Sequence, residues 1–164
     1  MAMGRQRKDQ TRWLTADERA AWLAISALTV KLPSALDAQL QRDAGLSYFE
    51  YMVLAVLSEQ PDRTLQMSDI AAFASASLSR LSHTATRLER EGLITRKQVP
   101  GHGRRTQATL TDAGFEKVRA TAPGHVTHVR RLLIDDLSAT ELATLTRIGD
   151  RALAKIEAAR SVDG

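Results

Sequence analysis

The hydrophobic positions from Ser77 to Lys97 repeat with the period of an α-helix. At 100° per residue, one side of this segment carries Leu78, Leu81, Ala85 and Leu88. The opposite side carries hydroxyl, imidazole and guanidinium groups, and within the segment no acidic residue precedes Glu89. The pattern predicts a helix that buries its leucines and presents a cationic, hydrogen-bonding face outward.

The chain after this helix changes its pattern within a few residues. Gly92 suits the left-handed conformation in which many helices end, and the apolar pair Leu93–Ile94 starts a strand-like segment. A second strand-like run, Arg105–Leu110, follows the tip sequence PGHG, so a β-hairpin is predicted over residues 93–110.

Two short elements precede the cationic helix. A helix capped by Ser68 is predicted over Met67–Phe73, after a loop that contains Asp62 and Arg63, and the residues Ala74–Ser77 turn the chain into the cationic helix. Two short helices joined by a tight turn and followed by a hairpin form a winged helix-turn-helix arrangement. In this arrangement the second helix enters the DNA major groove.

Longer helices are predicted on both sides of this region. Capping boxes, in which a Ser or Thr and a Glu three residues later bond each other's backbone, begin at Thr15, Ser47 and Ser138. Pro33 is expected to bend the first helix, and Pro123–Gly124 is expected to kink the helix that starts at Ala113. The predicted fold is mainly α-helical with a small β-hairpin wing.

We divide the chain into three predicted regions. Residues 1–14 form a basic tail that is expected to be mobile, and residues 47–110 form the winged helix-turn-helix DNA-binding domain. Residues 15–46 and 111–164 form a helical dimerisation lobe. A homodimer is expected because this lobe has more apolar side chains than the winged domain can cover, namely Leu132, Leu133, Leu137, Leu142, Leu145, Ile148 and Ile156.

The distribution of charge supports an anionic partner. Net charge is only +4, but Leu78 to Arg105 holds seven Lys or Arg against two Glu. Nucleic acid is the commonest partner of such a local basic excess. An acidic lipid surface is less favoured, because the leucine stripe is short and interrupted by alanine, as expected for a core.

The DNA contacts predicted from this face come from the cationic helix and from the wing. Small hydroxyls permit close approach, and arginine can bind guanine with two hydrogen bonds or hold a phosphate. In the major groove we expect Ser79, Arg80, Ser82, His83, Thr86 and Arg87. At the wing tip, Arg104 and Arg105 are placed to enter a minor groove.

Other classes of protein have little support in the sequence. The chain has no cysteine, no phosphate-binding glycine loop, no nucleophile elbow and no H-E-x-x-H pattern, so neither an enzyme nor a cofactor is expected. His125 and His128 have no evident third ligand for a metal. No segment has the apolar run of a secretory signal or the roughly 20 apolar residues of a membrane span, so a cytoplasmic location is expected.

The segment SRLSHTATRLEREGLITR (Ser79–Arg96), the wing GHGRRTQATLT (Gly101–Thr111) and the helix opening Thr111–Gly114 resemble the multiple antibiotic resistance regulator (MarR) family. The resemblance extends from Thr15 to about Ala159. It implies a dimeric winged-helix transcription factor, usually a repressor, often released from DNA by a small aromatic or phenolic ligand. It also implies DNA contacts by the recognition helix and by one wing arginine.

Several alternatives stay open from the sequence alone. Family members commonly carry an aspartate two residues before the wing arginine, where this chain has His102, so either Arg104 or Arg105 is the groove-entering residue. A low-specificity architectural DNA-binding protein is one alternative function. A helical ligand-binding or interaction protein without operator binding is another. Aromatic residues that could line an effector cleft are Trp22, Tyr48, Phe49 and Tyr51.

Overall fold

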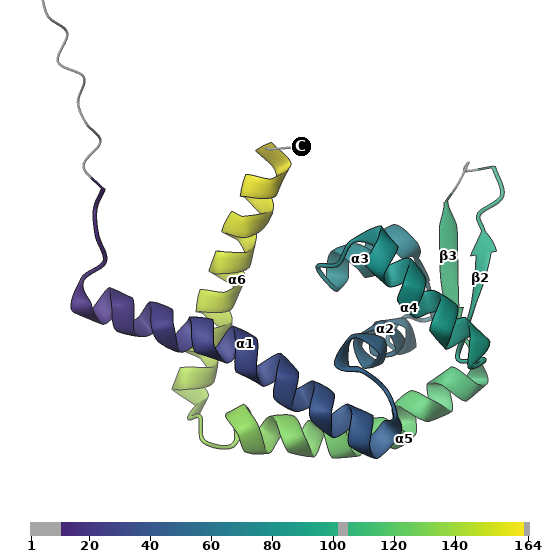
Figure 1. Ribbon diagram of the computed structural model, residues 1–164, viewed down its shortest axis with the longest axis horizontal. Helices are drawn as coiled ribbons and strands as arrows, with labels where there is room; N and C mark the ends of the chain where they lie inside the picture. The colour runs from purple at the N-terminus through teal and green to yellow at the C-terminus, as the bar shows by residue number, and fades with distance from the viewer. Residues whose placement is uncertain (1–10, 102–104, 163–164) are drawn as a thin grey trace, which may run out of the picture. The chain divides into compact units, whose positions relative to one another are not determined.

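The computed structural model describes residues 11–101 and 105–162, which divide between Ala35 and Leu36 into two compact units. The elements are α1 (Ala16–Ala44), α2 (Tyr48–Ser58), β1 (Thr64–Gln66), α3 (Met67–Phe73), α4 (Leu78–Arg90), β2 (Ile94–Gln98), β3 (Thr106–Leu110), α5 (Asp112–Val129), the π-helical turn η1 (Arg130–Ile134) and α6 (Ala139–Val162) (Figure 1). The protein is mainly helical with a small antiparallel wing, which confirms the fold class predicted from the sequence.

The wing belongs to a three-stranded antiparallel sheet in which β3 lies between β1 and β2. The predicted hairpin is confirmed, with Ile94 opposite Leu110 across β2 and β3. The third strand is a correction, because the sequence assigned no strand to residues 64–66. Three residues are too few to show an alternating pattern, and β1 is defined by its pairing, with Thr64 opposite Thr109.

The core lies where α2, α3 and α4 pack against the sheet, as Figure 1 shows for α4 and β2. The large side chains that are less than 2% exposed come from these elements, from the last turns of α1 and from the connection between α1 and α2: Leu40, Leu46, Val53, Leu54, Leu57, Ile70, Leu81, Leu88 and Ile94. A single apolar core of this kind fixes the orientation of the short helices relative to the wing.

Three predicted helix starts are confirmed, and one is wrong. At Ser47 the side-chain hydroxyl accepts from the Glu50 amide at 3.1 Å, and the Glu50 carboxylate accepts from the Ser47 amide at 2.8 Å. Thr15 and Ser138 open their helices with the same reciprocal bonds. Ser68 does not cap α3. The cap is Gln66, whose side chain makes no capping bond, because α3 starts directly where β1 ends.

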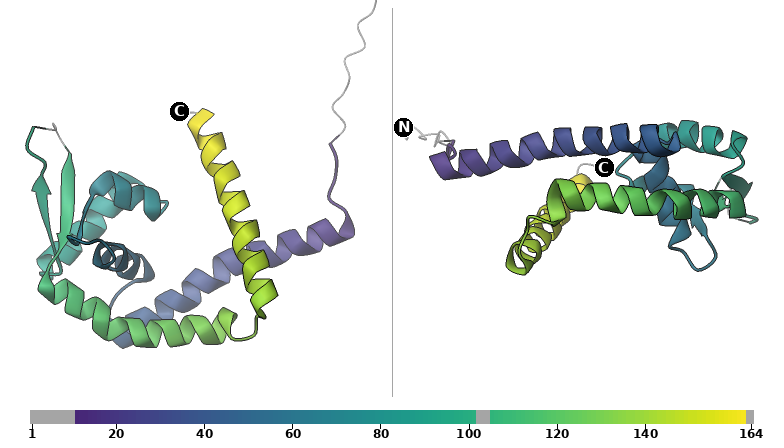
Figure 2. Two further views of the ribbon diagram at one scale, coloured as in Figure 1. Left: turned by 180° about the vertical axis from the view of Figure 1, so that it is seen from behind. Right: turned by 90° about the horizontal axis from the view of Figure 1, so that it is seen from below.

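The helix after the wing begins at a close approach between backbones. The Thr111 hydroxyl donates to the carbonyl of Gly92 at 2.7 Å and accepts from the Gly114 amide at 3.0 Å. A Cβ atom on Gly114 would collide with the carbonyl oxygen of Leu93, so glycine is required here. Figure 2 shows α5, in green, leading from the foot of the hairpin past α2, with which it packs.

α5 is continuous through Pro123 and Gly124 as far as Val129. The expected kink therefore does not divide the helix, and the change of helix type comes six residues after Gly124, where η1 begins at Arg130. None of the helices in the described ranges is long and apolar enough to cross a membrane.

Candidate nucleic-acid interface

Helix α4 presents the polar face that the sequence predicted. Its start is capped by Ser77, whose hydroxyl accepts from the Arg80 amide at 3.2 Å. Leu81, Ala85 and Leu88 are fully buried and direct the other side of the helix outward. The predicted contact residues on α4 that are exposed are Ser79, Arg80, Ser82, His83 and Arg87, and Thr86 is half-buried.

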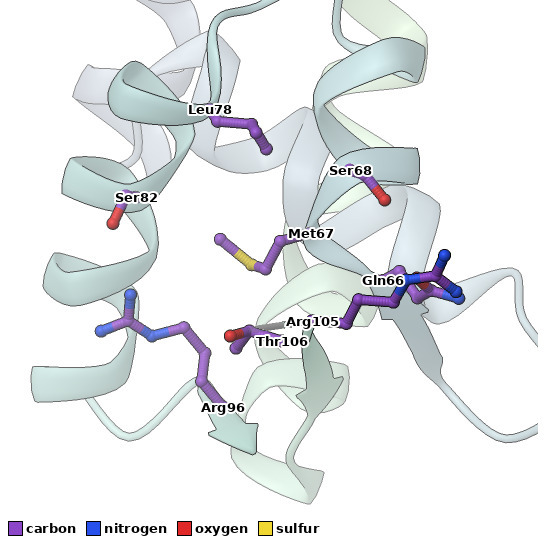
Figure 3. A pocket seen from close by; sticks show the side chains of 8 residues that line it. All are labelled: Gln66, Met67, Ser68, Leu78, Ser82, Arg96, Arg105 and Thr106. Carbon is purple, nitrogen blue, oxygen red and sulfur yellow. The ribbon is translucent and has the colours of Figure 1, made fainter. Parts of the chain in front are cut away.

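Leu78 departs from the predicted leucine stripe. Its side chain is 58% exposed, whereas Leu81 is completely buried. Leu78 is the first residue of α4 and lies one turn ahead of the core, so its side chain points into a groove beside the wing rather than into the core (Figure 3). A helical wheel assigns it to the buried side, because the wheel ignores where the helix begins.

The groove between α4 and the sheet has a volume of about 460 Å³. Figure 3 shows its walls: α4 and Arg96 on one side, the start of α3 on the other, and the beginning of β3 at the base. It is lined by Gln66, Met67, Ser68, Leu78, Ser82, Arg96, Arg105 and Thr106. Two arginines and several hydroxyl or amide groups therefore line the space between α4, which is the predicted recognition helix, and the wing.

The wing is tied to α4 by Arg96 of β2. The Arg96 amide donates to one carboxylate oxygen of Glu89 at 2.9 Å, and its guanidinium donates to the other at 2.8 and 3.1 Å. This arginine lowers the pKa of Glu89 through these hydrogen bonds and its charge. The same guanidinium donates to the Thr86 hydroxyl at 3.1 Å, and that hydroxyl donates to the Ser82 carbonyl. The Thr86 hydroxyl is thus already bonded within the protein.

The two arginines that flank the polar face have different surroundings. The guanidinium of Arg80 lies 4.3 Å from the centre of the Phe49 ring, where a cation–π contact leaves its N–H edges available. Arg87 instead forms an ion pair with Glu50 and a second with Glu91, both at 3.1 Å. No local pattern predicts the contact with Glu50, because it joins residues 37 positions apart.

The wing residues are placed only in part. Arg105 is exposed directly before β3, and its carbonyl accepts from the Val99 amide at 2.8 Å, which closes the hairpin. Arg104 and His102 lie outside the described residues. Arg105 therefore lines the groove beside α4, whereas the choice of Arg104 or Arg105 as the residue that enters the minor groove stays a prediction.

The histidine pair predicted on α5 lies away from this surface. His125 Nδ1 lies 3.4 Å from Oε1 of the buried Gln39, and its ring is 4.6 Å from that of Tyr51. Burial lowers the pKa of His125, with a smaller contribution from His128. Among the described residues, no cluster of three His, Cys, Asp or Glu side chains could hold a metal ion.

A short helix pair, an outward polar face on its second helix and an adjacent basic wing define a winged helix-turn-helix DNA-binding protein. The family model described as "MarR family" matches residues 44–105. The chain is 41% identical to Sco3205, a MarR family regulator from Streptomyces coelicolor solved in complex with DNA, over 90% of this chain and 91% of that one, with a TM-score of 0.83. The chain belongs to the MarR family of transcriptional regulators, which are not enzymes.

Two further solved structures have the same fold. AbsC, a MarR family regulator from Streptomyces coelicolor, is 36% identical over 90% of this chain and 99% of that one, with a TM-score of 0.84. PcaV from the same organism, solved with its natural ligand, is 21% identical over 88% and 98% of the two chains, with a TM-score of 0.70. The likeness to PcaV supports the fold alone. No curated protein matches the chain.

Proposed function

We propose that this chain is a cytoplasmic transcriptional repressor that binds a pseudo-palindromic operator as a homodimer. The observation that carries the proposal is the exposed polar face of α4 beside a basic wing. The DNA complex of Sco3205, at 41% identity, supports the same use of the fold. Two recognition helices related by a two-fold axis would contact half-sites about one helical turn apart.

The proposed major-groove contacts are the exposed residues of α4 whose side chains are directed away from the core: Ser79, Arg80, Ser82 and His83. Arg105 is the proposed wing contact, and Arg104 keeps its predicted role as the alternative. Contacts by Thr86 and Arg87 stay predictions, although both side chains have bonding partners inside the protein.

The homodimer is proposed from the apolar side chains that the single chain leaves exposed. In α6 these include Leu145, Ile148, Leu153 and Ile156, each at least 38% exposed. Monomeric proteins rarely expose a continuous apolar surface of this kind. We keep the proposed division into a tail (1–14), a winged domain (47–110) and a dimerisation lobe (15–46 and 111–164).

Selection of binding sites from a random duplex pool, followed by titration at several salt concentrations with competitor DNA, tests the proposal. Specific binding to a two-fold symmetric site is expected to survive competitor and to weaken with salt, because Lys and Arg displace counterions from phosphates. Binding without sequence preference would indicate an architectural protein. Absence of any binding would indicate a ligand-binding or interaction protein.

A small aromatic or phenolic effector is the proposed release signal. Within the second unit, Tyr48 and Tyr51 lie around the ring of His125, at 6.2 and 4.6 Å between ring centres. A neighbouring depression of about 190 Å³ includes the cationic side chains Arg42 and Arg131, which suit a carboxylate. Of the other predicted aromatic residues, Phe49 is half-buried on α2, where its ring contacts Arg80, and Trp22 is exposed in the first unit.

Calorimetry tests this effector with free protein and with protein saturated by its selected operator. A releasing ligand must bind free protein more tightly, by the same factor by which it weakens operator binding, and about 1–3 kcal/mol of coupling is typical. Salicylate and related phenols are suitable first compounds. Equal affinities in the two titrations would exclude that compound as the release signal.

A further inference from the structure

The guanidinium of Arg87 is bonded to three other residues of the protein, although its helix is the one proposed to contact DNA. Its Nη1 lies 3.1 Å from the carboxylate of Glu50, its Nε donates to Glu91 at 3.1 Å, and its Nη2 donates to the carbonyl of Gly45 at 3.3 Å. All three guanidinium nitrogens therefore have partners. The hydrogen bond to Glu91 and the charge of Glu50 raise the pKa of Arg87.

The contact with Glu50 matters because the Glu50 carboxylate is buried. Its side chain is only 5% exposed, and its second oxygen accepts from the Ser47 amide at the start of α2. A buried carboxylate needs a counter-charge, because leaving it alone costs much of its solvation energy. Arg87 is the cation that the structure places against this carboxylate.

Two of the three partners of Arg87, Gly45 and Glu50, lie at the elbow between α1 and α2. Gly45 has a positive φ of 68° there, and the Leu46 amide returns to the Leu40 carbonyl, so the elbow ends α1 and leads into α2. The Gly45 carbonyl points to Arg87. One side chain of the recognition helix thus bonds both to the elbow backbone and to the carboxylate that caps the next helix.

We propose that Arg87 is a positioning residue, which clamps the recognition helix to the α1–α2 elbow and sets its angle for DNA, instead of reading a base. The inference rests on the proposed operator binding. If the Arg87 N–H that now faces Glu50 bound guanine instead, that carboxylate would be left buried without its cation. The clamp therefore acts on DNA affinity through Glu50, a residue whose side chain is almost inaccessible to DNA.

The sign of the effect of Glu50→Gln separates the clamp from simple electrostatics. This substitution removes a negative charge, so electrostatics alone predicts tighter DNA binding. The clamp predicts weaker binding to the operator, because Arg87 loses its partner and α4 loses its anchor. We expect Glu50→Gln and Arg87→Gln each to weaken operator binding roughly tenfold, and the double variant to be no weaker than the weaker single variant.

Salt dependence and a conservative variant test the same point. Among the residues that the structure describes, two of the five N–H groups of Arg87 have no partner, and a phosphate contact by these would reduce the salt slope by about one when Arg87 becomes Gln. The clamp predicts an unchanged slope. Arg87→Lys keeps the charge but cannot make the three bonds, so the clamp predicts operator binding almost as weak as that of Arg87→Gln. If Arg87 instead contacts a phosphate, lysine would serve in its place and affinity would be largely kept.

The experiment is fluorescence anisotropy with the selected operator and a scrambled duplex at four salt concentrations, on the full chain. Arg90→Gln is the control, since it removes an exposed arginine from the same helix. The effects of Arg90→Gln and Glu50→Gln on operator affinity should be additive. Circular dichroism confirms folding, and if Arg87→Gln does not fold, the Arg87→Lys and Glu50→Gln variants carry the same test.

The outcomes are separable. A wild-type protein that selects no operator would contradict the proposed function, before any variant is considered. With operator binding intact, unchanged or tighter binding by Glu50→Gln, additive effects of Glu50 and Arg87, or a reduced salt slope would each overturn the clamp. Non-additive losses at an unchanged slope, larger on the operator than on the scrambled duplex, would support it.

Discussion

Helices α4 and α6 both carry apolar residues at helical spacing, but these residues have opposite environments. In α4 the apolar residues Leu81, Ala85 and Leu88 are completely buried against the core. In α6 no side chain described between residues 139 and 159 is buried, and Leu153 and Ile156 are more than half exposed. The apolar side chains of α4 are thus covered within the chain, whereas those of α6 are left exposed, as the proposed dimer would require.

The polar contacts of α4 and α6 also differ, because those of α4 reach other elements of the fold. Arg87 and Glu89 of α4 bond to residues of α2 and β2, so they join separate elements. The capping bonds at the start of α6 stay within four residues, between Ser138 and Glu141. Long-range polar contacts therefore hold α4 in one orientation, while the described contacts of α6 are local.

The largest expected effect is on α6. Replacing Leu153 and Ile156 together by Glu should abolish the proposed dimer, because two carboxylates would be buried in an apolar interface. Operator affinity should fall by about 100-fold or more, since each half-site is then bound separately. Analytical ultracentrifugation measures the first effect and anisotropy the second. Arg151→Gln, at an exposed polar position of α6, is the control, and a double variant that stays dimeric would refute this interface.

The buried face of α4 is tested by a pair of leucines on one helix. Leu81→Ala should lower the free energy of unfolding by about 2–5 kcal/mol, as expected for a buried leucine. Leu78→Ala should change it by less than about 0.5 kcal/mol, because Leu78 is 58% exposed. Urea denaturation measures both. Equal effects of the two substitutions would show that the leucine stripe is buried as a whole.

A pair of glycines compares backbone packing in the two regions. Gly114→Ala should destabilise the protein by about 1–3 kcal/mol, because the new methyl group meets the Leu93 carbonyl and the Leu110 side chain. Gly149→Ala lies in mid-helix with no atom near the new methyl group, so it should stabilise α6 by about 0.5–1 kcal/mol. Thermal denaturation measures both. Destabilisation by Gly149→Ala would instead indicate that a partner subunit approaches the α6 backbone closely.

The smallest effect concerns pH and His125. Because burial lowers the pKa of His125 from its ordinary value of 6.5, the unfolded chain takes up a proton at a higher pH than the folded chain. The free energy of unfolding should therefore be highest above about pH 6.5 and should fall as the pH drops below this value, until folded His125 is also protonated. Denaturation midpoints between pH 5 and 8 measure this dependence.

His125→Gln should reduce that dependence, whereas His83→Gln, which replaces an exposed histidine of α4, should leave it as in the wild type. An unchanged profile for His125→Gln would show that another group is responsible.

Local features of the chain were predictable because their causes lie within one or two helical turns. The capping boxes at Thr15, Ser47 and Ser138 join residues three positions apart, and the structure contains all three. The positive φ at Gly92 and the outward polar face of α4 follow from the same short-range rules. Together with the β-hairpin, these were enough to predict the winged helix-turn-helix and the surface that carries the candidate contacts.

Short-range patterns in the sequence were thus enough for the order of the helices and the hairpin, the outward polar face of α4 and the class of protein. Tertiary packing is what makes β1 complete the sheet, places Leu78 in a groove and bonds Arg87 to Glu50. Each of these depends on residues far apart in the chain, and periodicity carries no information about which distant groups meet. A helical wheel gives an arginine the same outward position whether it contacts DNA or a buried carboxylate 37 residues away, and packing alone distinguishes the two.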